Sequence, residues 1–141
     1  MEIRPFQYAD RSAVIDLWQR CNLIMPWNNP VRDIERKLAV APDLLLVGLL
    51  GERLVAAGMA GYDGHRGWVN YLAVEPMLQR QGLGRALMGA IEARLAAGGC
   101  PKVNIQVRSR HASALGFYQR LGYDVDEVVS LGKRLTSDEP D

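Results

Sequence analysis

The residues with the clearest chemical potential lie in the segment 74–86, where a short apolar run gives way to two closely spaced glycines. Gly82 and Gly84 come directly before an amphipathic helical pattern, so a loop there leads straight into a helix. The first backbone N–H groups of a helix have no partner within the helix, and glycine lets a ligand approach them closely. The helix dipole and the side chains of Arg80 and Arg85 favour an anion such as phosphate at this point. The two glycines could also serve only to shape a tight turn.

Two familiar phosphate-binding motifs do not fit this loop. A dinucleotide-binding fingerprint requires a third glycine or alanine three residues after Gly84, and that position holds Leu87. It also requires an acidic residue about 20 residues further on, which this sequence lacks. A P-loop requires lysine and then serine or threonine, whereas Gly84 is followed by Arg85. An anion site here is therefore of another kind.

Two motifs in the second half of the chain resemble those of the GNAT N-acetyltransferases. The first is Gln79-x-x-Gly82-x-Gly84 after a predicted strand, which resembles the acyl-CoA-binding motif of that family. The second is the stretch ALGFYQRLGY at positions 114–123, which is similar to the family's second signature helix. The resemblance implies transfer of an acetyl group from acetyl-CoA to a primary amine, by direct attack in a ternary complex and without a metal.

The resemblance also implies where acetyl-CoA would lie. Backbone amides from Gln81 to Arg85 would hold its pyrophosphate, a strand edge would pair with its pantetheine arm, and an N–H near Leu72 would polarise the thioester carbonyl. His111 departs from the family, whose members often carry asparagine at this position, and the neighbouring Arg108 and Arg110 could meet a phosphate or simply be solvated. The coenzyme-binding residues expected on this basis are Leu72, Ala73, Val74, Gln79, Arg80, Gln81, Gly82, Leu83, Gly84, Arg85, His111 and Tyr118.

Tyr118 matches the family tyrosine that lies near the coenzyme sulfur. A phenol with a pKa of about 10 can donate a proton to a leaving thiolate whose pKa is about 8.5. The alternative interpretation places Tyr118 in the core, because Leu115 and Leu121 fall on the same helical stripe.

The group that takes a proton from the attacking amine is less defined by the sequence. Trp68 occupies the strand position at which some relatives carry a glutamate. Asp63 and Glu75 are the carboxylates that we expect near the reacting centre, with His65 and Asn70 as further candidates. All four residue types are also common as turn-forming or solvated residues. A non-catalytic acyl-CoA-binding module is therefore the alternative function.

The acceptor is expected to bind beside the loop Leu23–Asn29 and the helix that follows it. Trp27 and Met25 offer apolar contacts there, and Asp33 and Glu35 could attract a cation. These residues suit a small, amino-acid-like amine or the N-terminus or a lysine of a protein.

Periodicity and turn residues predict elements in the order β-α-α-β-β-β-α-β-α-β. This order predicts a single α/β (α+β) domain, with a mixed, mostly antiparallel sheet flanked by helices as in GNAT proteins. Helices are expected after Asp10, from Asn29 and Pro30, from about Gly84, and over Ala112–Leu121. Strands are expected at Met1–Gln7, Leu44–Leu50, Leu54–Ala60, Trp68–Val74, Val103–Val107 and Val125–Leu135.

Composition sets the broad class of this protein. Its 141 residues, 48% hydrophobic and 23% charged, predict one globular domain over 1–135, followed by an acidic flexible tail over 136–141. A net charge of +1 argues against a general nucleic-acid binder. Cys21 and Cys100 match no zinc spacing, and no apolar run approaches the length of a membrane span. We expect a cytoplasmic protein, which could form a homodimer through its final strand.

Overall fold

The computed structural model describes residues 1–139, which fall into two compact units. The first unit comprises Met1–Ile105 together with the C-terminal residues from Asp138, and the second comprises Gln106–Ser137. The expectation of a single domain over 1–135 remains a prediction.

The first unit contains a five-stranded sheet with the strands in sequence order, β1-β2-β3-β4-β5. Neighbouring strands are antiparallel except for β4 and β5, which are parallel. The mixed, mostly antiparallel α+β architecture is therefore confirmed. The strands are β1 Glu2–Pro5, β2 Leu45–Leu50, β3 Arg53–Tyr62, β4 Gly67–Val74 and β5 Val103–Ile105.

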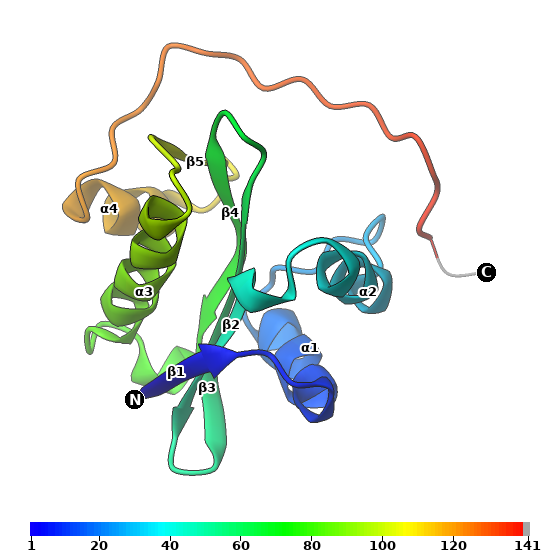
Figure 1. Ribbon diagram of the computed structural model, residues 1–141, viewed down its shortest axis with the longest axis vertical. Helices are drawn as coiled ribbons and strands as arrows, with labels where there is room; N and C mark the ends of the chain where they lie inside the picture. The colour runs from blue at the N-terminus through cyan, green and yellow to red at the C-terminus, as the bar shows by residue number, and fades with distance from the viewer. Residues whose placement is uncertain (140–141) are drawn as a thin grey trace. The chain divides into compact units, whose positions relative to one another are not determined.

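Helices cover both faces of this sheet: α1 and α2 lie on one side of the strands and α3 on the other (Figure 1). On α1, the side chains of Val14, Leu17 and Trp18 are fully buried and pack in one core cluster with residues of the strands. On α3, Leu87 and Ile91 are fully buried at the spacing of one helical stripe. The α-helices are α1 Arg11–Arg20, α2 Pro30–Val40, α3 Leu83–Ala97 and, in the second unit, α4 Ala112–Arg120; single 3-10 turns span Tyr8–Asp10, Pro42–Leu44 and Pro76–Leu78.

Helix α2 begins as its sequence predicts. Asn29 has an extended backbone, its side-chain oxygen accepts a hydrogen bond from the N–H of Arg32 at 3.3 Å, and Pro30 occupies the first helical position. Asparagine is among the strongest N-cap residues, and proline fits a position whose N–H would have no partner. The cap fixes where α2 starts along the sheet.

Replacing Asn29 by alanine should lower the free energy of unfolding by about 1 kcal/mol, because the capping acceptor is lost. Chemical denaturation followed by circular dichroism would measure the change. Glu35→Ala, at an exposed position of the same helix, is the control and should change stability by less than about 0.5 kcal/mol. Equal effects of the two substitutions would contradict the capping role.

The strand predicted over Val125–Leu135 is wrong for this structure, and β5 ends at Ile105 instead of Val107. The apolar residues of the predicted strand remain exposed, with Val128 at 77% and Leu131 at 92%. Its apolar positions do not alternate strictly, and Gly132 interrupts them. A strand is stable only when a neighbour satisfies its backbone, and β-rich composition does not supply that neighbour. The observed order therefore lacks the final strand.

Candidate active site

The parallel strands β4 and β5 run together only over their first residues. Gly67, Trp68 and Val69 pair with Val103–Ile105, after which β5 ends while β4 continues to Val74. Strand β5 therefore does not extend alongside Leu72, Ala73 and Val74, the three residues expected to pair with a pantetheine arm. An extended ligand with amide groups can use a strand edge of this kind.

A bulge lies in β4 immediately before these three residues. Tyr71 has a positive φ of 56°, and the register between β3 and β4 shifts between Ala57 and Met59. Two contacts hold Tyr71 in this unusual conformation: its hydroxyl donates to the Asp33 carboxylate at 2.6 Å, and its ring stacks on Trp18 with centroids 4.1 Å apart. Bulges redirect the residues beside them and are frequent next to active sites. Here the bulge sets the orientation of the Leu72 backbone at the edge of β4 along which β5 does not extend.

The glycine-containing loop adopts the conformation that its sequence indicates. Gly82 has a φ of 85° and Arg80 a φ of 66°, so left-handed residues flank Gln81. Alternation of this kind turns successive backbone N–H groups toward one side and creates a concave anion site. No side chain caps the N-terminus of α3, and its first turn contains no acidic residue. A Cβ atom built on Gly82 would meet nothing within 4 Å, so the loop is open on that side.

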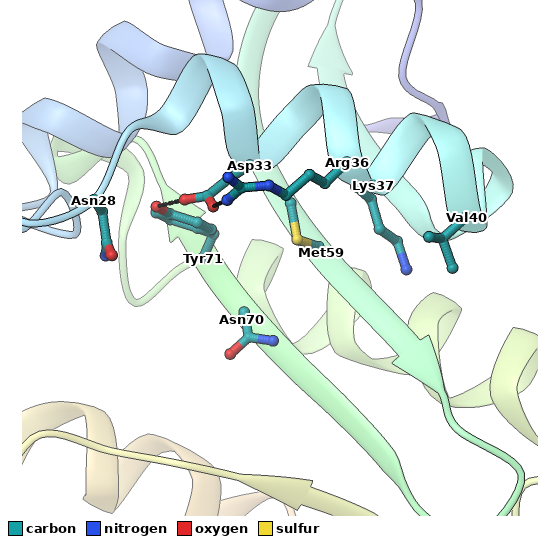
Figure 2. A pocket seen from close by; sticks show the side chains of 8 residues that line it. All are labelled: Asn28, Asp33, Arg36, Lys37, Val40, Met59, Asn70 and Tyr71. Carbon is teal, nitrogen blue, oxygen red and sulfur yellow. Dashed lines mark hydrogen bonds and ion pairs between the residues drawn. The ribbon is translucent and has the colours of Figure 1, made fainter. Parts of the chain in front are cut away.

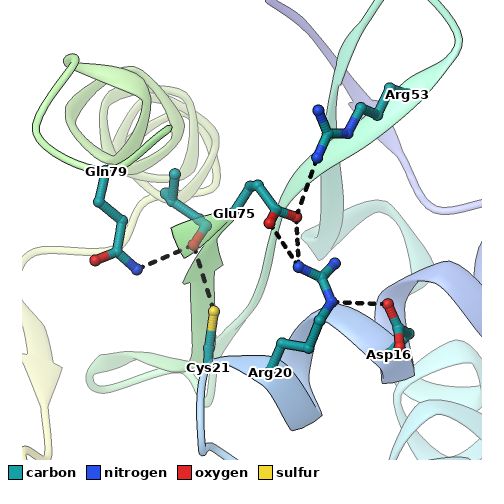
Figure 3. A network of polar contacts seen from close by, with 7 residues as sticks. Asp16, Arg20, Cys21, Arg53, Glu75 and Gln79 are labelled. Atoms are coloured by element: carbon teal, nitrogen blue, oxygen red, sulfur yellow. Dashed lines mark hydrogen bonds and ion pairs between the residues drawn. The ribbon is translucent and has the colours of Figure 1, made fainter. Parts of the chain in front are cut away.

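An ion-pair network around the buried carboxylate of Glu75 fixes the turn between β4 and this loop (Figure 3). Glu75 is 5% exposed, and Nη1 of Arg20 donates to both of its carboxylate oxygens at 2.6 Å. Arg53 lies 3.8 Å from the same carboxylate, and Asp16 accepts from the other side of Arg20 at 2.9 Å. The hydrogen bonds to Glu75 and then Asp16 raise the pKa of the Arg20 guanidinium. Both oxygens of Glu75 thus face arginine.

The carbonyl of Val74 is held from two sides at the same turn. The side-chain amide of Gln79 donates to it at 3.1 Å, and the thiol of Cys21 lies 3.3 Å away (Figure 3). Gln79, which sequence reasoning placed among the coenzyme-binding residues, therefore links the end of β4 to the glycine loop.

Asp63 lies in the turn between β3 and β4. Its carboxylate accepts the backbone N–H groups of Arg66 at 2.7 Å and His65 at 2.8 Å. These two hydrogen bonds, with Arg66 contributing most, hold the pKa of Asp63 below its ordinary value. The side chain therefore has the contacts of an Asx turn.

A pocket of about 400 Å³ opens between α2 and strands β3 and β4 (Figure 2). Asn70 is the one of the four candidate proton acceptors that lines it, and Asp63, His65 and Glu75 do not. From the expected acceptor side, Asp33 lines the pocket, whereas Trp27 and Glu35 do not. The lining residues are Asn28, Asp33, Arg36, Lys37, Val40, Met59, Asn70 and Tyr71.

Tyr118 and His111 belong to the second unit. Tyr118 is mostly buried, with edge-to-face contacts to Phe117 at 5.0 Å and Tyr123 at 6.0 Å between ring centroids. Burial alone raises the pKa of Tyr118 to about 12. His111 is the N-cap of α4, where its carbonyl accepts the N–H of Ala114 at 3.1 Å.

Sequence comparison decides the family. The profile of the "Acetyltransferase (GNAT) family" matches residues 11–123. Acetyltransferase ECA0875 of Pectobacterium atrosepticum is 46% identical over 138 residues, which cover 98% of each chain. This chain belongs to the GNAT acetyltransferase family. The GNAT assignment makes it an acyl-CoA-dependent N-acetyltransferase, with acetyl-CoA as the family's acetyl donor.

Solved structures confirm the GNAT fold. The aminoglycoside antibiotic 6'-N-acetyltransferase AAC(6')-IG of Acinetobacter haemolyticus superposes with a TM-score of 0.77 and 18% identity, covering 96% of this chain and all of its own. AAC(6')-Iy, solved with a bisubstrate analogue containing CoA, has a TM-score of 0.75 and 17% identity, with 94% and 97% coverage. At these identities the likeness establishes the fold alone.

Two residues of this GNAT site could not be singled out from the sequence. Tyr71 is one of several aromatic residues in strands, and only the fold reveals its positive φ and its bond to Asp33. Lys37 lies in no recognised motif, and only the folded structure places it in the wall of the pocket. Within residues 1–139, no helix is long and apolar enough to cross a membrane, and no cluster of His, Cys, Asp and Glu could hold a metal ion.

Proposed function

We propose that this GNAT enzyme acetylates the primary amine of a small acceptor that binds in the pocket between α2 and the sheet. The observation that carries the proposal is that β4 runs without interruption from the pocket to the strand edge expected to bind the acetyl donor. Asn70 and Tyr71 line the pocket, and Leu72, Ala73 and Val74 follow at once on the strand edge that β5 leaves open. One strand therefore offers a place for the acceptor and, next to it, a place for the acetyl donor. The pocket volume of about 400 Å³ is in the range of small-molecule sites.

The residues present fit acetyl-CoA. The backbone groups of Leu72, Ala73 and Val74 that point away from β3 would hold the pantetheine arm, apart from the Val74 carbonyl, which already accepts from Gln79 and Cys21. An N–H at Leu72 would stabilise negative charge on the carbonyl oxygen. The loop from Gln79 to Arg85 would bind the pyrophosphate, because its left-handed residues and the uncapped start of α3 concentrate N–H donors. The complex of AAC(6')-Iy with a CoA-containing analogue supports CoA as the ligand class. Bound acetyl-CoA supplies the activated acetyl group.

The amine would attack directly in a ternary complex. Its nitrogen bonds to the carbonyl carbon, the bond from carbon to sulfur breaks, and the sulfur leaves as a thiolate. We assign the hydroxyl of Tyr118 to donate a hydrogen bond to that sulfur. Because burial raises the pKa of Tyr118 to about 12, the phenol stays protonated throughout the physiological range. With a thiol pKa of about 8.5, complete transfer of the proton is uphill, so hydrogen bonding to the thiolate is the greater part of this role.

The proton of the attacking amine needs an acceptor. Asp63 and Glu75 remain predictions for it, but the carboxylate of Asp63 accepts two backbone hydrogen bonds and that of Glu75 two from Arg20. An amine that reaches the pocket already deprotonated needs only water as its proton acceptor.

Release of free thiol tests the proposed function. The protein would be incubated with acetyl-CoA and a panel of small primary amines, with lysine-containing and N-terminal peptides as the comparison set. Saturable thiol release with a small amine supports the proposal, and preference for peptides would redirect it to a protein acceptor. Saturable binding of CoA without turnover on any amine would favour the non-catalytic acyl-CoA-binding module.

Tyr118→Phe should lower kcat by at least about tenfold and leave the affinity for CoA nearly unchanged, because the ring contacts stay and only the hydroxyl is lost. Steady-state kinetics and calorimetry would measure the two quantities. Tyr123→Phe removes a neighbouring hydroxyl and is the matched control. An unaltered kcat in Tyr118→Phe would remove Tyr118 from the mechanism.

A further inference from the structure

Helix α2 places opposite charges one turn apart in the wall of the pocket. Asp33 and Lys37 are four residues apart, so they lie on the same face of the helix, and both line the cavity (Figure 2). They form no ion pair with each other. Asp33 instead accepts from the hydroxyl of Tyr71 at 2.6 Å and lies 3.7 Å from Arg36. The pocket wall therefore carries the Asp33 carboxylate with Arg36 beside it and, one turn further along α2, the ammonium of Lys37.

Lys37 is a half-buried cation without a carboxylate within 4.0 Å among the described residues. Burial lowers its pKa, while the more distant charge of Asp43 acts in the opposite direction. Taking an ammonium partly out of water is unfavourable unless another group compensates it. An anionic group of a ligand in the pocket would supply that compensation.

The neighbouring cation, Arg36, is already engaged. Its two terminal nitrogens each donate to a carboxylate oxygen of Asp138 at 2.7 Å, and Arg32 lies 3.6 Å from the same group. Asp138 is 1% exposed, so this bidentate pair is part of the folded structure. Of the two cations that line the pocket, Lys37 is thus the one left to bind an anion.

Asp33 and Lys37 have different neighbours. Asp33 is bonded to Tyr71, which directly precedes the Leu72 edge proposed for the acetyl donor. Lys37 lies one turn further along α2, where its Nζ would be 3.3 Å from a Cβ atom at Gly61 on β3. A ligand with an ammonium at Asp33 and an anion at Lys37 would therefore direct its amine toward the reacting group, which the amine attacks after the ammonium has lost one proton to water.

We propose that the acceptor is an amine that also carries a carboxylate, such as a free amino acid, with its ammonium at Asp33 and its carboxylate at Lys37. This inference rests on the proposed function and adds the charge of the substrate to it. The single charge of Lys37 suits a carboxylate, whereas arginine is the side chain favoured for bidentate binding of phosphate. Asn28 and Asn70 line the same pocket and carry amide donors for the second carboxylate oxygen.

Matched pairs of acceptors test this inference. Each amino acid would be compared with its own primary amide, which keeps the amine and the side chain but loses the negative charge. We expect kcat/KM to be about tenfold higher for the acid. The amine of the amide is less basic than that of the acid, so a larger fraction of it is unprotonated and reactive at neutral pH. This difference favours the amide and therefore opposes the expected preference for the acid. Equal or higher kcat/KM for the amides would overturn the inference while leaving the acetyltransferase function intact.

The variant Lys37→Met tests whether Lys37 causes the preference for the acid over the amide. Methionine keeps an unbranched chain of similar length and removes the unfavourable burial of the ammonium, so the variant should fold. The ratio of kcat/KM for the acid to kcat/KM for the amide should fall to about twofold or less, because KM for the acid rises. Lys133→Met, at an exposed lysine of the second unit, removes the same charge and should keep the ratio of the wild type. A preference that survives Lys37→Met would overturn the assignment.

Calorimetry separates failure of this inference from failure of the proposed function. Binding of an N-acetyl amino acid and of its amide would be measured with the wild type and with Lys37→Met, in the presence of CoA. We expect the acid to bind about tenfold more tightly than the amide to the wild type only. If no amine is ever acetylated, the proposed function fails, and this binding comparison alone decides whether the pocket recognises a carboxylate. Equal binding of acid and amide would show that it does not.

Discussion

Replacing Arg20 by methionine should clearly lower the urea concentration at the midpoint of unfolding, because the carboxylate of Glu75 would stay buried without its hydrogen-bonded partner. Glu75 is 5% exposed, and Arg20 provides both of its 2.6 Å hydrogen bonds. Arg53 has an exposed side chain and lies 3.8 Å from the same carboxylate, beyond hydrogen-bond distance. Urea denaturation of the wild type and the variant would give the difference.

Two further variants separate this effect from a general loss of surface charge. Asp16→Ala removes only the exposed partner of Arg20 and should change stability by less than about 0.5 kcal/mol. In the double variant Arg20→Met with Glu75→Gln, the buried charge disappears together with its partner, so part of the lost stability should return. A double variant less stable than Arg20→Met would mean that Glu75 stabilises the turn without Arg20.

The same network explains why sequence reasoning could not assign Glu75. Its position after a strand and before a glycine loop suggested a carboxylate near the reacting centre. Its partner, however, lies 55 residues earlier in the chain, on α1. Pairing over such a separation depends on how α1 packs against the end of β4, and no local pattern records that packing.

Features set by short-range geometry could be predicted. The start of α2 follows from the capping acceptor of Asn29 and the fixed φ of Pro30. The loop before α3 needs glycine at position 82, because its φ of 85° is disfavoured for residues with a Cβ atom. The start of α2 is confirmed, and so is a loop that leads directly into a helix near Gly84, since each depends on the backbone of a few consecutive residues.

Features set by long-range pairing could not be predicted. The run Val125–Leu135 has the composition of a strand but acquires no strand partner in the described structure. Lys37 belongs to an ordinary amphipathic helix, and its value as a ligand group arises from the cavity that β3 and β4 complete. Sequence periodicity identifies which face of α2 is polar, but it does not show which polar residues share a cavity.

Gly82→Asp should weaken the binding of CoA by at least about 100-fold, because the new carboxylate would both repel the pyrophosphate and accept the N–H groups that hold it. The substitution has room, since a Cβ at Gly82 meets nothing within 4 Å. Aspartate tolerates the left-handed conformation better than most residues and is a strong helix N-cap. The left-handed φ of 85° at this position strains any side chain, so the variant should fold with somewhat lower stability than the wild type. Isothermal titration with CoA would measure affinity, and thermal denaturation would verify folding.

Gly82→Asn is the matched control for the charge, because asparagine has the same shape, also tolerates a positive φ and also caps helices. We expect it to weaken CoA binding by only about tenfold, through competition for the same N–H donors without repulsion. The difference between the two variants should shrink as salt rises, because repulsion between exposed charges is screened. Wild-type affinity in Gly82→Asp would contradict the loop as the pyrophosphate site. Equal losses in both variants would assign the effect to occupied N–H donors and not to charge.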